Sequence, residues 1–200
     1  MLAVSQSGLQ ELIQSGISAG SGLLGVFVGG WLTGKHQKKE RQNARRREQL
    51  MEFYAPLRGI RAEIKAKSEL RTKVHAAAGS LWSDKFQGVD DPANKKRIDE
   101  QTGPKYDKIW DYSDEQLKKE IVPLYRKMLE HFSTHMGLAE ESTLGHYQVL
   151  VEFVEIWNRF LQNSLPGEVA NKLDHSETKL YPLYEDIEAN FKRLSHALRG

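Results

Sequence analysis

Two histidines, His131 and His135, have a spacing that could hold a metal ion, because side chains four residues apart share one face of a helix. The segment reads His-Phe-Ser-Thr-His and lacks the glutamate of the zinc-protease motif. Glu130 and His146 are further candidate ligands, but no regular spacing links them to the pair. We therefore expect His131 on a polar helix face, His135 at its boundary, and no metal site.

The other reactive side chains form no catalytic pattern. The chain has no cysteine, no phosphate-binding glycine loop and no nucleophile elbow. A catalytic acid pair needs burial and a shifted pKa, whereas the acids of this chain fall at expected helix starts or on polar faces. These acids include Asp111, Asp114, Glu115, Glu140, Glu141, Glu185 and Asp186. The sequence therefore predicts no enzyme activity, no catalytic residue and no cofactor.

The segment from Leu12 to Gly34 carries no charge and is long enough, at about 1.5 Å per residue, for a helix to cross a bilayer core of about 30 Å. A signal peptide would have basic residues before its apolar core, but here they follow it, so we predict a retained transmembrane helix. Only the part from Leu23 to Leu32 is strongly apolar. A helix lying in the membrane interface and a buried hairpin in a soluble protein are therefore the alternatives.

A dense basic run follows the uncharged segment. Residues 35–54 contain seven Lys or Arg against three Glu, whereas residues 55–200 are nearly neutral. The positive-inside rule places this run in the cytoplasm and the N-terminus outside. Beside a membrane helix, each basic side chain near the surface gains about 1 kcal/mol from anionic lipid headgroups. The residues assigned to headgroup contact and topology are Trp31, Lys35, Lys38, Lys39, Arg41, Arg45, Arg46 and Arg47.

Small residues recur at helical spacing along the uncharged segment, several of them four apart. Such rows let helix backbones approach closely in lipid, so they predict a homo-oligomer. The residues assigned to helix association are Gly16, Gly20, Gly22, Gly25, Gly29, Gly30 and Gly34. The alternatives are the ordinary glycine content of membrane helices and a glycine-lined pore.

The rest of the chain reads as helices, because apolar residues recur three and four apart and no strand-like alternation of useful length occurs. We predict an all-α chain with three parts. A short tail and the single transmembrane helix (1–34) continue through a basic juxtamembrane helix (35–54) into a cytoplasmic antiparallel bundle (55–200) of three to five helices.

Within the bundle, a long flexible loop is expected near residues 79–94, where Gly, Asp and Pro gather. Residues 93–110 are weakly patterned and predict short helical pieces.

Ser113 and Ser142 are expected to cap the helices that follow them. Val74 is in phase with the apolar face of the helix before the loop.

Three prolines, Pro56, Pro123 and Pro182, each precede a leucine and apolar residues at helical spacing, which predicts a helix start or kink with the following residues packed inward. The step Phe53-Tyr54-Ala55-Pro56-Leu57, after an apolar segment and a basic run, resembles uncharacterised bacterial single-pass membrane proteins. The resemblance covers about residues 20–70 and implies no activity.

Together these patterns predict a helical interaction or regulatory protein of the bacterial inner membrane. It would contact membrane lipids, self-associate through its glycine-rich helix and bind a protein partner with its cytoplasmic bundle. The alternative is a membrane-perturbing effector, of toxin or phage-defence type, whose glycine-rich helix permeabilises the membrane when triggered. A membrane-tethered enzyme and a protein that binds nucleic acid through the basic run are the remaining hypotheses, and the near-neutral remainder disfavours nucleic acid.

Overall fold

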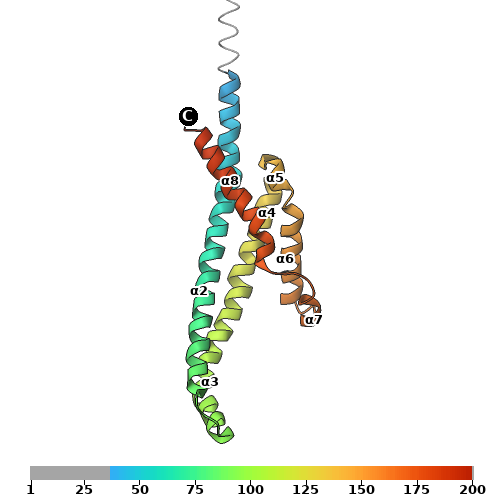
Figure 1. Ribbon diagram of the computed structural model, residues 1–200. Coiled ribbons are helices and arrows are strands. Elements are labelled where there is room, and N and C mark those ends of the chain that lie inside the picture. Colours follow the sequence, from blue (N-terminus) through green and yellow to red (C-terminus); the bar gives the residue numbers. More distant parts are fainter. Residues whose placement is uncertain (1–36, 200) are drawn as a thin grey trace, which may run out of the picture. The chain divides into compact units, whose positions relative to one another are not determined.

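A computed structural model describes residues 37–199 of the chain (Figure 1). The chain divides into two units, Met1–Arg47 and Glu48–Gly200. Every regular element among the described residues is helical, which confirms the predicted all-α bundle. In the first unit, residues 37–47 form a helix. Among the helices of residues 37–199, none combines the length and apolarity needed to cross a membrane, and the predicted span (12–34) lies outside the described residues.

Two long helical runs of the second unit form a hairpin (Figure 1). The first run consists of the π-helix η1 (Gln49–Tyr54) and α2 (Ala55–Phe86), and the second of α3 (Pro92–Gln116), the π-helix η2 (Leu117–Ile121) and α4 (Val122–Thr134). Helix α2 contacts both α3 and α4, so the two runs are antiparallel. The turn between them contains Gly88 at φ 73°, a left-handed conformation that glycine adopts without steric cost.

The hairpin corrects two sequence predictions. The prediction of a long loop near residues 79–94 is wrong. Helices α2 and α3 occupy most of this range, and only residues 87–91 connect them. The prediction of short helical pieces at residues 93–110 is also wrong. These residues belong to one continuous helix, α3, which passes through Gly103 and Pro104. Trp82 of α2 packs edge-on against Tyr106 of α3, with ring centroids 5.0 Å apart, and a Cβ at Gly103 would lie only 3.7 Å from the Trp82 ring. This tertiary packing outweighs the helix-breaking tendency of the sequence.

Both long runs change to a π-helix immediately before a proline. The N–H groups of Ala55 and Val122 each bond to the carbonyl five residues earlier. The wider turn accommodates the rings of Pro56 and Pro123, which in a regular α-helix would clash with the carbonyl four residues earlier. Pro182 lies in the first turn of the C-terminal helix. The predicted role of these prolines as helix starts or kinks is confirmed.

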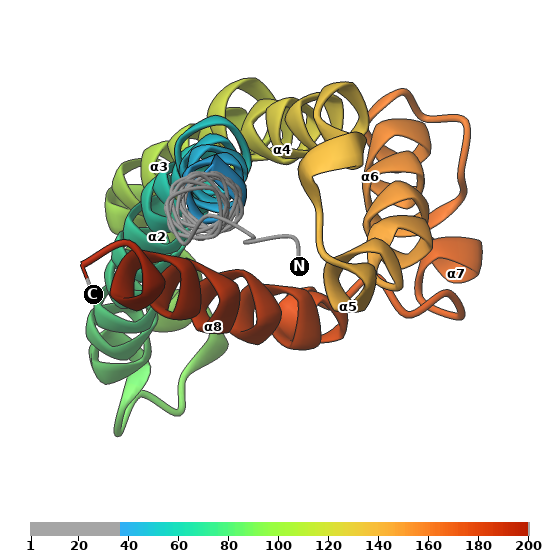
Figure 2. The same cartoon turned by 90° about the horizontal axis from the view of Figure 1, so that it is seen from above.

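Shorter elements complete the second unit: η3 (Met136–Leu138), α5 (Glu141–Leu144), α6 (Tyr147–Leu161), α7 (Gly167–Ala170), η4 (Glu177–Leu180) and α8 (Tyr181–Ala197). Helix α6 packs on α4, and α8 packs on η1, α2 and α5 (Figure 2). The two predicted caps are wrong. Ser113 is buried inside the continuous α3, and Ser142 lies within α5, whereas His146 precedes α6.

One hydrophobic core joins η1, α2, α4, α6 and α8. Its fully buried side chains include Phe53, Leu57, Ile64, Met128, Phe132, Leu150, Leu180 and Leu194. Each such side chain contributes about 1.5–3 kcal/mol by leaving water. The residues that follow the three prolines therefore pack inward, as predicted. Phe53 and Tyr54, which the sequence analysis groups with the basic juxtamembrane helix, belong to this core instead.

Candidate interaction surface

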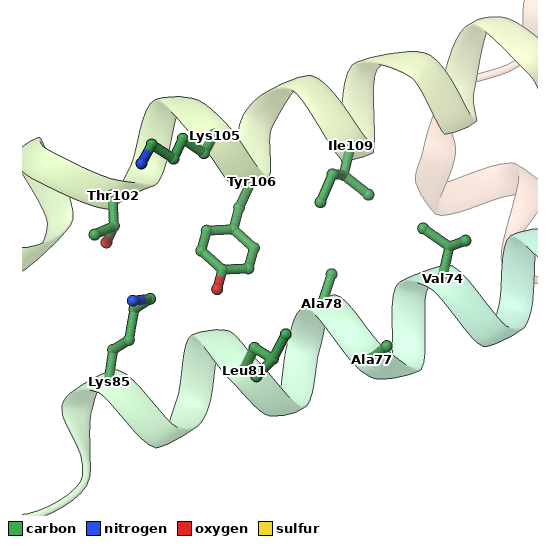
Figure 3. Close-up of a pocket in the computed structure, with 9 residues that line it drawn as sticks. All are labelled: Val74, Ala77, Ala78, Leu81, Lys85, Thr102, Lys105, Tyr106 and Ile109. Carbon is green, nitrogen blue, oxygen red and sulfur yellow. The ribbon is translucent and has the colours of Figure 1, made fainter.

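An open groove of about 430 Å³ runs along the α2–α3 hairpin. Its lining residues are Val74, Ala77, Ala78, Leu81 and Lys85 of α2 and Thr102, Lys105, Tyr106 and Ile109 of α3. Figure 3 shows the apolar side chains of the two helices facing one another across this space. We call it the α2–α3 groove.

The groove follows directly from the helical repeat. Its positions on each helix recur three or four residues apart, so they share one face of α2 and one face of α3. Ala77 and Ala78 have side chains too short to reach across, which leaves the middle of the groove open (Figure 3).

Aromatic contacts hold the hairpin together beside the groove. His75 of α2 meets Trp110 of α3 edge-on, with ring centroids 4.6 Å apart, and Trp82 contacts both Phe86 and Tyr106. Edge-to-face pairs of this kind add about 0.5–1.5 kcal/mol beyond the area that they bury. These contacts, one of which involves the wall residue Tyr106, hold the two walls of the groove relative to one another.

The groove leaves large apolar side chains in solvent. Leu81 is 59% exposed and Val74 is 39% exposed, and Leu70, which continues the row by one turn, is 59% exposed. The predicted position of Val74 on the core face is wrong, because α3 does not cover this side chain. A contiguous exposed apolar row is typical of an interaction site, whereas single exposed residues are ordinary.

The end of the groove near the α2–α3 turn is cationic. Lys85 and Lys105 both lie there (Figure 3), and neither forms an ion pair with another described residue. The hydroxyl of Thr102 donates to the carbonyl of Ile98 at 2.7 Å, so it is already satisfied. The groove thus offers apolar contact together with positive charge at one end.

A buried polar cluster ties η1 to α5 and α8. The Tyr54 hydroxyl lies 2.8 Å from Thr143 Oγ1 and accepts a hydrogen bond from the Glu140 N–H at 3.0 Å. Thr143 donates to Asp186, which also accepts from Asn190 Nδ2 at 3.1 Å. Burial raises the pKa of Tyr54 and keeps its phenol neutral. Because these polar groups satisfy one another, we assign the cluster a structural role.

His131 and His135 stack on one another with ring centroids 4.4 Å apart. His131 also faces Phe53 and is half-buried, so its predicted position on a polar face is wrong. Burial and then the neighbouring His135 lower the pKa of His131, while the backbone carbonyls of Glu52 and Phe53 act in the opposite direction. Within residues 37–199, no group of three or more His, Cys, Asp or Glu could hold a metal ion.

The described part of the basic run lies on the helix of residues 37–47. Its exposed side chains are Lys38, Lys39, Arg41, Arg45 and Arg47, while Arg46 is half-exposed and donates to Asn43 at 3.3 Å. The remaining predicted site residues lie outside the described residues: Lys35, Trp31, Gly16, Gly20, Gly22, Gly25, Gly29, Gly30 and Gly34.

No family model matches the chain, and searches of curated proteins and of solved structures find no match. The candidate site therefore rests on geometry. Sequence reasoning missed the α2–α3 groove, although a signal was present: Leu70, Val74, Ala77 and Leu81 are spaced four, three and four apart. That spacing equally fits a core-facing stripe, and only the packing of α3 shows that this row is uncovered.

Proposed function

We propose that this chain is a membrane-anchored interaction protein whose second unit binds a protein partner in the α2–α3 groove. Residues 12–34 cross the membrane, and the basic run contacts anionic headgroups on the cytoplasmic side. The uncharged length of the first segment and the cations that follow it support the anchor. The groove supports the binding role.

The observation that carries this proposal is the uncovered apolar row of α2. Fully burying a leucine side chain contributes about 1.5–3 kcal/mol. Leu81 is 59% exposed and Val74 is 39% exposed, so a partner that covers both gains a fraction of that energy at each position. Aromatic contacts between α2 and α3 already hold the groove walls in place, so little ordering is required on binding.

The occupant that fits best is an amphipathic helix of a partner protein. A groove between two antiparallel helices accepts a third helix, whose apolar anchors recur three and four residues apart. Lys85 and Lys105 at one end would pair with carboxylates at the matching end of that helix. Charge at the rim sets orientation and selects among partners, while the apolar row supplies most of the affinity.

Site-specific photo-crosslinking in cells tests this binding mode. A photoreactive residue at Leu81 of the full chain should give a discrete adduct with another protein, and the same residue at exposed Ser83, on the opposite side of α2, should not. Val74→Asp should abolish the Leu81 adduct, and the pair Lys85→Glu and Lys105→Glu should weaken it at least tenfold.

Three outcomes would contradict the proposal. They are equal adducts from Leu81 and Ser83, an adduct that survives Val74→Asp, or an adduct that consists only of two copies of this chain. The last result would identify the groove as a self-association surface instead. Val74 and Leu81 are exposed, so the variants should fold normally, and an unchanged unfolding midpoint is the check.

A further inference from the structure

A second cavity, separate from the α2–α3 groove, lies where α2, η2, α4 and α6 meet the segment before η4. It has a volume of about 220 Å³, and its walls include Arg71, Ile121, Phe153, Trp157 and Glu177. We propose that this cavity binds a small organic carboxylate whose apolar body packs on the aromatic walls and whose carboxylate pairs with Arg71. This inference does not depend on the proposed partner-binding role of the groove.

Arg71 is the group that points to an anion. Its Nε atom is buried and has no hydrogen-bond partner. Its Nη2 atom lies 3.6 Å from Asp114, whose side chain is 80% exposed, so this pair is a weak surface contact. The Arg71 side chain is 28% exposed, so the accessible part of its guanidinium can pair with a ligand carboxylate, for which its planar donors are well suited.

The walls of the cavity suit an apolar ligand body. Ile121, Val122 and Phe153 are buried and line the cavity, and Trp157 stands half-buried beside them. The cavity is smaller than the roughly 300–1,000 Å³ of sites for drug-sized molecules, so the ligand must be small. Leu117 and Ile121 come from the π-helical segment η2, and short π-helical turns inside α-helices are frequently found at functional sites.

The one acidic wall residue, Glu177, is already engaged. Its carboxylate lies 3.3 Å from Arg61 Nη1 and accepts a hydrogen bond from the Tyr184 hydroxyl at 3.3 Å. The Arg61 guanidinium also stacks over the Tyr184 ring at 3.9 Å. Arg61 Nη1 pairs with Glu177 only as an ion pair, since this atom has no hydrogen-bond partner. Arg61 offsets part of the charge of Glu177 but does not line the cavity, so Arg71 is the wall cation that a ligand anion would meet.

Another wall residue, His175, is also fixed. Its Nδ1 atom lies 2.9 Å from the Leu173 carbonyl and 3.0 Å from the Ala170 carbonyl, so this nitrogen donates to the backbone. The His175 ring meets Trp157 edge-on at 5.5 Å. These contacts hold the aromatic wall in place before a ligand enters, which reduces the ordering cost of binding.

Thermal unfolding of the purified full chain in detergent tests the proposal with phenylacetate and butyrate as probes. A ligand that binds only the folded state raises the unfolding midpoint with concentration. At least one of the two acids should raise the midpoint, while phenylacetamide and butyramide, which match their shapes but carry no charge, should not.

Two variants assign the effect to the cavity. Arg71→Gln removes the cation and should abolish the shift, whereas Arg159→Gln, at an exposed arginine of α6, should leave it unchanged. Thr72→Phe, at the exposed rim, should block the cavity without altering Arg71, and it serves if Arg71→Gln proves unstable. The proposal is wrong if neither acid raises the midpoint, if the amides act equally, or if the shift survives both variants.

Discussion

Tyr54 and Thr143 share a buried hydrogen bond of 2.8 Å that joins η1 to α5. Tyr54 lies at the end of η1, seven residues beyond the boundary with the first unit, and it has no exposed surface. Gln49, also in η1, donates to the Leu138 carbonyl at 3.0 Å. The start of the second unit is therefore fixed by specific polar contacts as well as by apolar packing.

Replacing Tyr54 by Phe should destabilise the second unit. The change keeps the ring but leaves the Glu140 N–H without its acceptor, which costs about 1–3 kcal/mol. It also removes the hydrogen bond between the phenol and Thr143 Oγ1, although Thr143 still bonds to Asp186. The denaturant midpoint of the full chain in detergent measures the loss. Tyr112→Phe is the matched control, because Tyr112 is 67% exposed, and its midpoint should not change. Equal midpoints for the two variants would show that the cluster contributes nothing to stability.

Acid should destabilise the second unit through His131. Its pKa is lowered in the folded state from an ordinary value of 6.5, so below that pH the unfolded chain binds more protons and stability falls. His131→Phe retains an aromatic ring against Phe53 and removes the titrating group, so it should reduce the loss of stability on acidification.

Denaturant midpoints above and below pH 6.5 measure this dependence for both chains. His196→Phe is the control, since His196 is exposed near the end of α8, and it should keep the full dependence. A pH dependence that is the same in His131→Phe as in the parent chain would contradict the assignment.

Two glycines should respond to alanine in opposite directions. Gly79 lies inside α2 with no atom near the position of an added Cβ, so Gly79→Ala should stabilise the unit by about 0.5–1 kcal/mol. Gly88 has φ +73°, which an alanine adopts only at a cost of about 1–2 kcal/mol, so Gly88→Ala should destabilise it. Thermal midpoints that shift with the same sign would contradict the described hairpin turn.

The glycine-rich segment should mediate self-association. The chain has no native cysteine, so a single cysteine at Gly29 should give an intermolecular disulfide in oxidised membranes. Gly25→Leu should lower the crosslinked fraction several-fold, while Val26→Leu should not. If the Gly29 cysteine variant gives only monomer, the glycine-rich segment does not mediate self-association.

The membrane-perturbing alternative makes a different prediction. Overexpression of the chain would depolarise the membrane, and Gly25→Leu would abolish this effect.

The helical class and the core faces could be predicted from the sequence because they depend on local spacing. The apolar residues after Pro56, Pro123 and Pro182 recur at three and four, and all three sets pack inward. Pro56 and Pro123 directly follow π-helical turns inside continuous helical runs, and Pro182 lies in the first turn of α8.

The extent of α2 and α3 and the position of the groove could not be predicted in this way. Gly103 and Pro104 favour a break locally, but Trp82 and Tyr106 pack across the hairpin and keep α3 continuous. Val74 has the same spacing as the core residues of α2, and its exposure depends on where α3 lies. Both outcomes depend on contacts between residues that are distant in the sequence.

The proposed function requires that residues 12–34 cross a membrane and leave the second unit in the cytoplasm. Alkaline extraction of bacterial membranes that contain the full chain, with a C-terminal reporter active only in the cytoplasm, tests it directly. We predict a chain that stays in the membrane pellet with an active reporter. Leu24→Lys with Val28→Lys, each costing about 2.5–3.5 kcal/mol at the centre of a span, should release it. Recovery of the parent chain in the soluble fraction, or a reporter located in the periplasm, would contradict the account.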